Sequence, residues 1–171
     1  MAFELAQAAA AEIRRQTGVE HEVAIVLGSG WLPAAELFGN TLVEIPYSEL
    51  PGFHSPGVQG HGGAARSVDL GEGKRALVLL GRTHFYEGRG VDAVVHGVRT
   101  AAAAGARALV LTNACGGLNP NWQPGTPVLI SDHINFTGQT PLKGANFVDL
   151  TEVYSKRLRQ LCQQIDPTLD E

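Results

Sequence analysis

The ionisable side chains between Arg82 and Glu87 are the part of this sequence best suited to chemistry. They follow the apolar run 77–80, with Gly81 between, so they lie where a buried strand is expected to end. Open α/β sheets bind ligands at the carboxyl ends of their strands. An arginine offers a planar fork of donors suited to phosphate, and the imidazole of His84 adds a donor whose charge changes near neutral pH. The segment therefore predicts an anion site; the alternative is a basic loop end neutralised by Glu87.

Two other apolar runs also end in small or glycine-rich turns. Run 23–27 is followed by the turn 28–30, and run 108–112 is followed by the segment 113–117. Glycine-rich turns leave backbone N–H groups able to approach an anion, and the Ser29 hydroxyl adds a further donor. We therefore expect the three strand ends to meet at one rim of a sheet.

The apolar runs are spaced as in an α/β fold. Strands are expected at 23–27, 76–80, 108–112 and 127–131, with shorter candidates near 42–45 and 65–70. A helix is predicted from Asp92, its expected N-cap, to Ala104, with Gly105 ending it. Strand, helix and strand over 76–112 then form a parallel crossover unit.

Helices are also expected at both ends of the chain. The first residues look amphipathic, with Phe3, Ala10 and Ile13 available to pack, and a second helix is expected over 158–164. Between them, 51–63 contains too many glycines and prolines for regular structure and is expected to be a mobile loop beside the site.

The charge and composition of the chain argue against several classes of protein. The 171 residues carry a formal net charge of -4, which argues against a nucleic-acid-binding surface, and they suffice for one domain over 1–171. No apolar stretch approaches the roughly 20 residues that span a bilayer. Cys115 and Cys162 are expected to be reduced thiols, and the six histidines show no metal-ligand spacing. We therefore expect a cytoplasmic enzyme without a bound metal.

Known nucleotide loops do not explain the turn 28–30. The third glycine of a dinucleotide fingerprint would fall at Pro33, and no Walker lysine follows. Instead, five segments resemble, in order and spacing, the trimeric purine nucleoside phosphorylases, a family that includes the methylthioadenosine phosphorylases; these segments are 27–30, 59–63, 81–88, 112–118 and 131–135. Segment 138–144 is more similar to the nucleoside branch. The resemblance implies a central mixed, largely parallel β-sheet flanked by helices, and a homotrimer.

The resemblance also assigns roles to residues. His84 and Glu87 are expected to be the catalytic pair, in which the carboxylate keeps the imidazole protonated. The expected phosphate ligands are Ser29, His61, Arg82, Thr83, His84 and the backbone N–H of Ala114. The expected nucleoside contacts are Tyr86, Asn113 and, from a neighbouring subunit, Phe136. For His61 and Phe136 plainer interpretations stay open, namely loop exposure and ordinary packing.

The implied reaction is phosphorolysis: a purine ribonucleoside or 2′-deoxyribonucleoside and phosphate give the purine base and a pentose 1-phosphate. Inorganic phosphate is the co-substrate, and no cofactor is needed. Two alternatives stay open, a methylthioadenosine phosphorylase and a catalytically incompetent phosphate-binding fragment. Because family members are longer, we expect an incomplete domain that lacks the C-terminal, purine-recognising part and turns over poorly or not at all.

Overall fold

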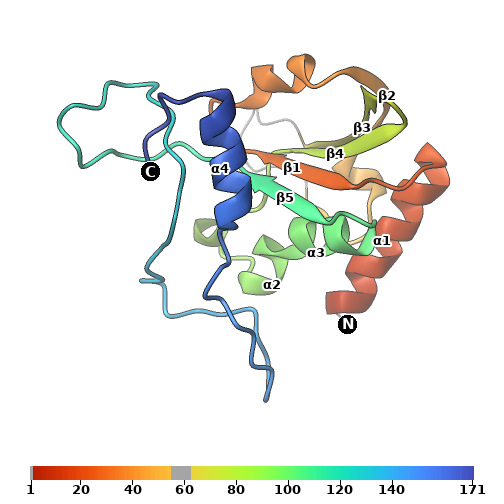
Figure 1. Ribbon diagram of the computed structural model, residues 1–171. Coiled ribbons are helices and arrows are strands. Elements are labelled where there is room, and N and C mark those ends of the chain that lie inside the picture. Colours follow the sequence, from red (N-terminus) through yellow and green to blue (C-terminus); the bar gives the residue numbers. More distant parts are fainter. Residues whose placement is uncertain (1, 55–62) are drawn as a thin grey trace. The chain divides into compact units, whose positions relative to one another are not determined.

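The computed structural model describes residues 2–54 and 63–171 (Figure 1). They form two compact units, Met1–Cys115 and Gly116–Glu171. The first unit holds a five-stranded sheet with its helices, and the second holds one helix and long irregular segments. That 1–171 is one domain stays a prediction.

The sheet of the first unit is mixed, and most of its strands run in one direction. Its strands are β1 (Val23–Leu27), β2 (Asn40–Pro46), β3 (Ala64–Gly71), β4 (Lys74–Leu80) and β5 (Ala108–Leu111), in the order β2-β3-β4-β1-β5. Strand β1 is parallel to β4 and β5, whereas β3 is antiparallel to β2 and β4. Only β3 therefore runs against the others. This arrangement confirms the predicted fold class and the parallel crossover from β4 to β5.

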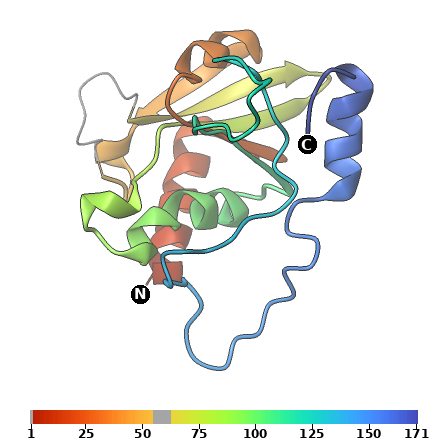
Figure 2. The same ribbon diagram turned by 90° about the vertical axis from the view of Figure 1, so that its left-hand side faces the viewer.

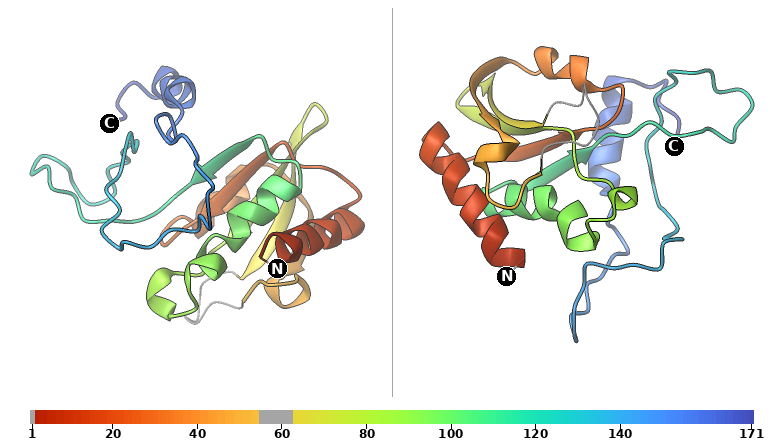
Figure 3. Two further views of the ribbon diagram at one scale, coloured as in Figure 1. Left: turned by 90° about the horizontal axis from the view of Figure 1, so that it is seen from below. Right: turned by 180° about the vertical axis from the view of Figure 1, so that it is seen from behind.

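Both faces of the sheet centre are covered. Helices α1 (Ala2–Thr17) and α3 (His96–Ala103) lie side by side across one face (Figures 2 and 3), where Arg14 Nη1 donates to the carbonyl of Ala103 at 2.8 Å. The short helix η1 (Leu32–Leu37) belongs to the other face. Strand β4 alternates between the faces: Leu77 and Leu79 pack in the α1 and α3 core, and Ala76, Val78 and Leu80 in the η1 core. A strand buried on both sides reads as the continuous apolar run seen here.

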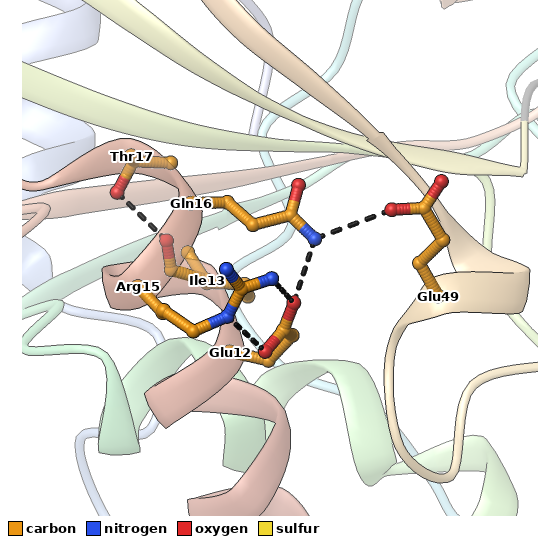
Figure 4. A network of polar contacts seen from close by, with 6 residues as sticks. All are labelled: Glu12, Ile13, Arg15, Gln16, Thr17 and Glu49. Atoms are coloured by element: carbon orange, nitrogen blue, oxygen red, sulfur yellow. Dashed lines mark hydrogen bonds and ion pairs between the residues drawn. The ribbon is translucent and has the colours of Figure 1, made fainter.

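Helix α1 forms as predicted, and a polar network attaches it to η2 (Tyr47–Glu49). Ala10 and Ile13 are buried, but Phe3 is 68% exposed and lies against the guanidinium of Arg99 instead of in the core. On the polar side, Gln16 Nε2 donates to Glu12 at 2.7 Å and to Glu49 at 3.2 Å (Figure 4). Hydrogen bonds from the Arg15 and Gln16 side chains lower the pKa of Glu12 to about 2.

The single helix predicted from Asp92 to Ala104 was wrong in two respects. The structure has α2 (Val91–Val94) and then α3, with a break at Val95, and Gly90 takes the N-cap position with a φ of 79°. A glycine adopts that angle readily, so it displaces Asp92 as the cap. Asp92 lies in the first turn and pairs with Arg99 at 2.9 Å.

The strand predicted at 127–131 was also wrong. In the described part of the second unit, that segment forms only an isolated bridge between Val128 and Asp170, supported by a bond from Leu129 N to the Asp170 carbonyl at 2.8 Å. Pro127 has no N–H to donate to a ladder, and one bridge is too short for a strand. The helix expected at 158–164 is confirmed as α4 (Lys156–Ile165), with Ser155 as its N-cap.

Candidate anion site at the strand ends

The carboxyl ends of β1, β4 and β5 meet at one edge of the sheet. Leu27 pairs with Leu80 and Val26 pairs with Leu111, so the three parallel strands end at nearly the same level. The turn after β1, the turn after β4 and the segment after β5 therefore leave the sheet together, as the sequence predicted.

Arg82 is fixed at this edge by a bond to the neighbouring strand end. Its Nη1 donates to the carbonyl oxygen of Thr112 at 2.7 Å. The side chain is half-buried, and burial lowers the pKa of the Arg82 guanidinium from its ordinary value without neutralising it. A charged guanidinium that is bonded through Nη1 still has other N–H groups that can donate to an anion.

Gly28 is packed too closely for any side chain. A Cβ placed there would lie 2.4 Å from the carbonyl oxygen of Thr112 and 2.9 Å from Arg82 Nη1. The backbone of β1 therefore approaches both groups closely, and Ser29 follows in an exposed turn closed by a bond from Trp31 N to the Gly28 carbonyl at 3.1 Å. The predicted serine thus directly follows the glycine over which Arg82 and the Thr112 carbonyl pack.

His84 and Glu87 form the predicted pair at the start of η3 (Phe85–Glu87). Glu87 Oε1 accepts from the His84 backbone N–H at 2.7 Å and lies 3.4 Å from His84 Nδ1. The backbone bond from His84 is the main cause that lowers the pKa of Glu87. Arg89 Nε lies 3.6 Å from the second carboxylate oxygen. An ionised Glu87 therefore holds both the loop and the imidazole.

Tyr86 lies against the same imidazole. Its ring stacks on His84 with 5.0 Å between centroids and an interplanar angle of 19°, and it is 77% exposed. Thr83, between Arg82 and His84, is half-buried. The exposed phenol presents a flat surface of the kind that sugars and bases contact.

The segment after β5 supplies the third side of the site. Asn113 and Ala114 are exposed, and the Asn113 carbonyl accepts from Trp31 Nε1 at 3.3 Å. Trp31 thus ties the turn after β1 to the segment after β5. The N–H of Ala114 follows one residue later.

For two predicted residues the structure gives no position relative to this group. His61 and the rest of 55–62 lie outside the described residues. Phe136 belongs to the second unit, where its side chain is 91% exposed. In that unit His133 shares a 2.9 Å hydrogen bond between its Nδ1 and the Tyr154 hydroxyl.

Sequence reasoning missed three residues that hold the site. Thr112 directly precedes the predicted Asn113, and Arg89 follows the predicted Glu87 by two residues. Their polar side chains next to predicted site residues could have indicated a role in the site. Tyr47 gave no signal, because its hydroxyl reaches the Gly81 carbonyl, at 2.8 Å, from 34 positions away in the sequence.

The described part of the chain has neither a metal-binding cluster nor a helix that could span a membrane. No group of three His, Cys, Asp or Glu side chains is placed to hold a metal ion among residues 2–54 and 63–171. Over the same residues, no helix is both long and apolar enough to cross a membrane.

Comparison with known proteins identifies the family. The model of the phosphorylase superfamily matches residues 22–170, which include every described strand end of the site. The chain belongs to the phosphorylase superfamily. Within it, the chain is 59% identical over 174 aligned positions to a purine nucleoside phosphorylase of a Cellulomonas species, covering 99% of this chain and 62% of that protein. A Mycobacterium tuberculosis purine nucleoside phosphorylase is 55% identical, with 98% and 63% covered.

Solved phosphorylase structures have the same fold. Isoform 2 of purine nucleoside phosphorylase from Schistosoma mansoni, solved with cytosine and ribose 1-phosphate, superposes with a TM-score of 0.83 at 34% identity, covering 95% of this chain and 60% of that one. The chain thus spans about three fifths of the length of these relatives.

Proposed function

We propose that this phosphorylase-superfamily chain is part of a purine nucleoside phosphorylase, which cleaves the N-glycosidic bond of purine nucleosides with inorganic phosphate. The observation that carries the proposal is the fixed Arg82, whose Nη1 bonds to the Thr112 carbonyl at 2.7 Å beside the turn that bears Ser29. The relatives at 55–59% identity are purine nucleoside phosphorylases, which supports the substrate class.

Phosphate would bind where the three strand ends meet. The proposed donors are the remaining N–H groups of Arg82, the hydroxyl of Ser29 and the N–H of Ala114, which come from three different strand ends at one edge of the sheet. His84 adds its imidazole, oriented by Glu87 at 3.4 Å. Thr83 and His61 are further proposed ligands. Because these donors are held in place before the anion binds, binding requires little free energy for reorganising the site.

Bound phosphate would act twice in the reaction. Breaking the bond between sugar and base develops positive charge at C1′, and an adjacent phosphate dianion stabilises that charge. The same anion, held in line, is the nucleophile that forms the new C1′–O bond while the base leaves with the electrons of the broken C–N bond. Tyr86 and Asn113 would line the sugar side of the nucleoside. The products are the purine base and the pentose 1-phosphate.

We also propose that the protein is a cytoplasmic homotrimer in which Phe136 reaches the nucleoside bound by a neighbouring subunit. Light scattering coupled to size-exclusion chromatography tests the assembly directly. A monomer at all accessible concentrations would contradict the trimer for this chain.

The test of the activity is release of hypoxanthine from inosine by the purified chain, with and without phosphate. Intact mass is checked in the same sample, so that a co-purifying longer protein is recognised. Phosphate-dependent release with formation of ribose 1-phosphate supports the proposal, whereas release that ignores phosphate contradicts it.

Two further arms address the alternatives. Methylthioadenosine is offered in parallel, and its preferential cleavage would favour the other branch of the family. Phosphate binding is measured by calorimetry, because saturable binding without cleavage of either nucleoside identifies a phosphate-binding fragment.

A further inference from the structure

The side chain of Thr112 joins the ends of β1 and β5. Its Oγ1 accepts from the backbone N–H of Gly28 at 2.9 Å and donates to the carbonyl of Val26 at 3.1 Å. The backbone N–H of Thr112 also donates to that Val26 carbonyl, at 3.0 Å. One hydroxyl therefore bonds to two backbone groups at the end of β1, the Val26 carbonyl within the strand and the Gly28 N–H just after it.

The backbone of the same residue orients Arg82. The Thr112 carbonyl accepts from Arg82 Nη1 at 2.7 Å, and the two groups pack over Gly28 at distances that only a residue without a Cβ allows. Thr112 is thus bonded to the strand end that carries Ser29 and to the arginine that leaves β4. It also immediately precedes Asn113 and Ala114 in the chain.

We propose that Thr112 is a positioning residue, whose hydroxyl fixes the distance between the Gly28–Ser29 turn and the Arg82 guanidinium. The inference rests on the proposed phosphate site and adds to it a residue that does not itself contact the anion. Without the hydroxyl, Gly28 N–H loses its acceptor, and the end of β5 is held to β1 by backbone bonds alone. The Thr112 carbonyl then moves relative to the turn, and Arg82 moves with it.

A simple packing role for Thr112 makes a different prediction, and Thr100 provides the comparison. Thr100 in α3 is fully buried, and its Oγ1 has no hydrogen-bond partner in the described part of the chain. Exchanging either threonine for valine keeps the shape and removes the hydroxyl. Thr100→Val therefore makes the same chemical change away from the rim, where no hydrogen bond is lost.

The experiment measures the affinity of the full chain for inorganic phosphate in four proteins: wild type, Thr112→Val, Thr112→Ser and Thr100→Val. All are compared at a temperature where thermal melts show each one folded. We expect Thr112→Val to weaken phosphate binding by about five- to tenfold, the effect of losing one good hydrogen bond. Thr112→Ser should restore most of the affinity, and Thr100→Val should bind like wild type.

A second readout tests Arg82 without any phosphate. The rate at which phenylglyoxal modifies Arg82, followed by peptide mass spectrometry, should rise in Thr112→Val and stay at the wild-type value in Thr112→Ser and Thr100→Val. Arg82 does not touch the Thr112 hydroxyl, so a loss confined to packing at Thr112 leaves this rate unchanged.

Each outcome decides the proposal. Unchanged phosphate affinity and unchanged Arg82 reactivity in Thr112→Val overturn it, and so does equal weakening in Thr112→Val and Thr112→Ser, since the serine keeps the hydroxyl. If the wild-type chain binds no phosphate, the proposed phosphate site fails, and the reactivity of Arg82 alone then decides whether Thr112 positions it.

Discussion

Tyr47 donates its phenolic hydrogen to the carbonyl oxygen of Gly81 at 2.8 Å, so a residue at the start of η2 holds the turn from which Arg82 leaves the sheet. The phenol is 2% exposed, and burial raises its pKa well above the ordinary value. It therefore stays a donor at neutral pH. The Gly81 N–H is bonded at the same time to the carbonyls of Leu27 and Leu79, each at 3.1 Å.

Replacing Tyr47 with phenylalanine tests the importance of this bond. The ring still packs against Phe53, with 4.6 Å between centroids, but the buried Gly81 carbonyl loses a donor. We expect a loss of about 1 kcal/mol in the free energy of unfolding, from urea titration, together with weaker phosphate binding. Ser67→Ala removes another buried hydroxyl, in the middle of β3 where Ser67 pairs with Leu77, and should lower stability while leaving phosphate affinity unchanged. Equal phosphate affinity in Tyr47→Phe and wild type would show that the Tyr47 hydrogen bond does not influence phosphate binding.

Gly28 is expected to tolerate no side chain. In Gly28→Ala the new methyl group would meet the Thr112 carbonyl at 2.4 Å and Arg82 Nη1 at 2.9 Å. Either β1 and β5 separate or the Arg82 contact breaks, so we expect a cost of roughly 1–3 kcal/mol in unfolding free energy and loss of phosphate binding. Gly116→Ala is the matched control, because a Cβ at Gly116 would meet nothing within 4 Å. Wild-type stability in Gly28→Ala would show that the rim relaxes freely.

The strand ends of the site could be predicted from the sequence because local patterns determine them. The apolar run of β4 is buried on both faces, so its end at Leu80 is evident, and the ionisable group begins two residues later. The His84 and Glu87 pair is local as well, at three residues' separation. The family resemblance added the roles of these residues, which composition and spacing alone do not give.

The features that the sequence did not predict correctly depend on residues far away in the chain or on whether a segment finds a strand to pair with. No pattern near Tyr47 indicates a bond to Gly81, because the contact exists only after β2, β3 and β4 pair. The run at 127–131 has strand composition, but in the described part of its unit only a single bridge pairs with it. Composition shows which residues can join a sheet, whereas a strand requires a neighbour.

Arg82 is expected to be irreplaceable even by lysine. Arginine donates to the Thr112 carbonyl with Nη1 and has further donors for an anion, whereas one ammonium group cannot reproduce that planar fork. We expect Arg82→Lys to bind phosphate at least about tenfold more weakly than wild type in calorimetry. This difference in affinity between the two proteins should shrink at high salt. Arg107→Lys, at the other end of β5 and exposed, is the control and should bind phosphate normally. Normal phosphate binding by Arg82→Lys would show that Arg82 acts only through its positive charge and not through its planar set of donors.

Glu87 is expected to act through His84. In Glu87→Gln the amide oxygen can still accept from the His84 backbone N–H, so the loop should keep its shape. The negative charge that lies 3.4 Å from the imidazole disappears. We therefore expect Glu87→Gln to bind phosphate more weakly than wild type in calorimetry, because the carboxylate no longer orients the imidazole by charge. Wild-type phosphate affinity in Glu87→Gln would contradict this coupling.

His21 is expected to make stability depend on pH through a site far from the strand ends. It is fully buried before β1, its Nε2 shares a 2.8 Å hydrogen bond with Ser67 Oγ, and its Nδ1 has no partner among the described residues. Burial, and secondly the charge of Arg75, lower its pKa below 6.5. The unfolded chain therefore binds the proton more readily, so this contribution is fully present above pH 6.5 and is lost as the pH falls below it. Burial also lowers the pKa of His96, which adds a change of the same sign.

The difference between wild type and His21→Gln isolates the contribution of His21. Glutamine can still bond to Ser67 but does not titrate, and the contribution of His96 is common to both proteins. Urea titrations between pH 5 and pH 8 should show a smaller fall in unfolding free energy toward acid for His21→Gln than for wild type. If His21→Gln loses stability toward acid as steeply as wild type, His21 does not titrate with unfolding and the buried imidazole has no part in acid sensitivity.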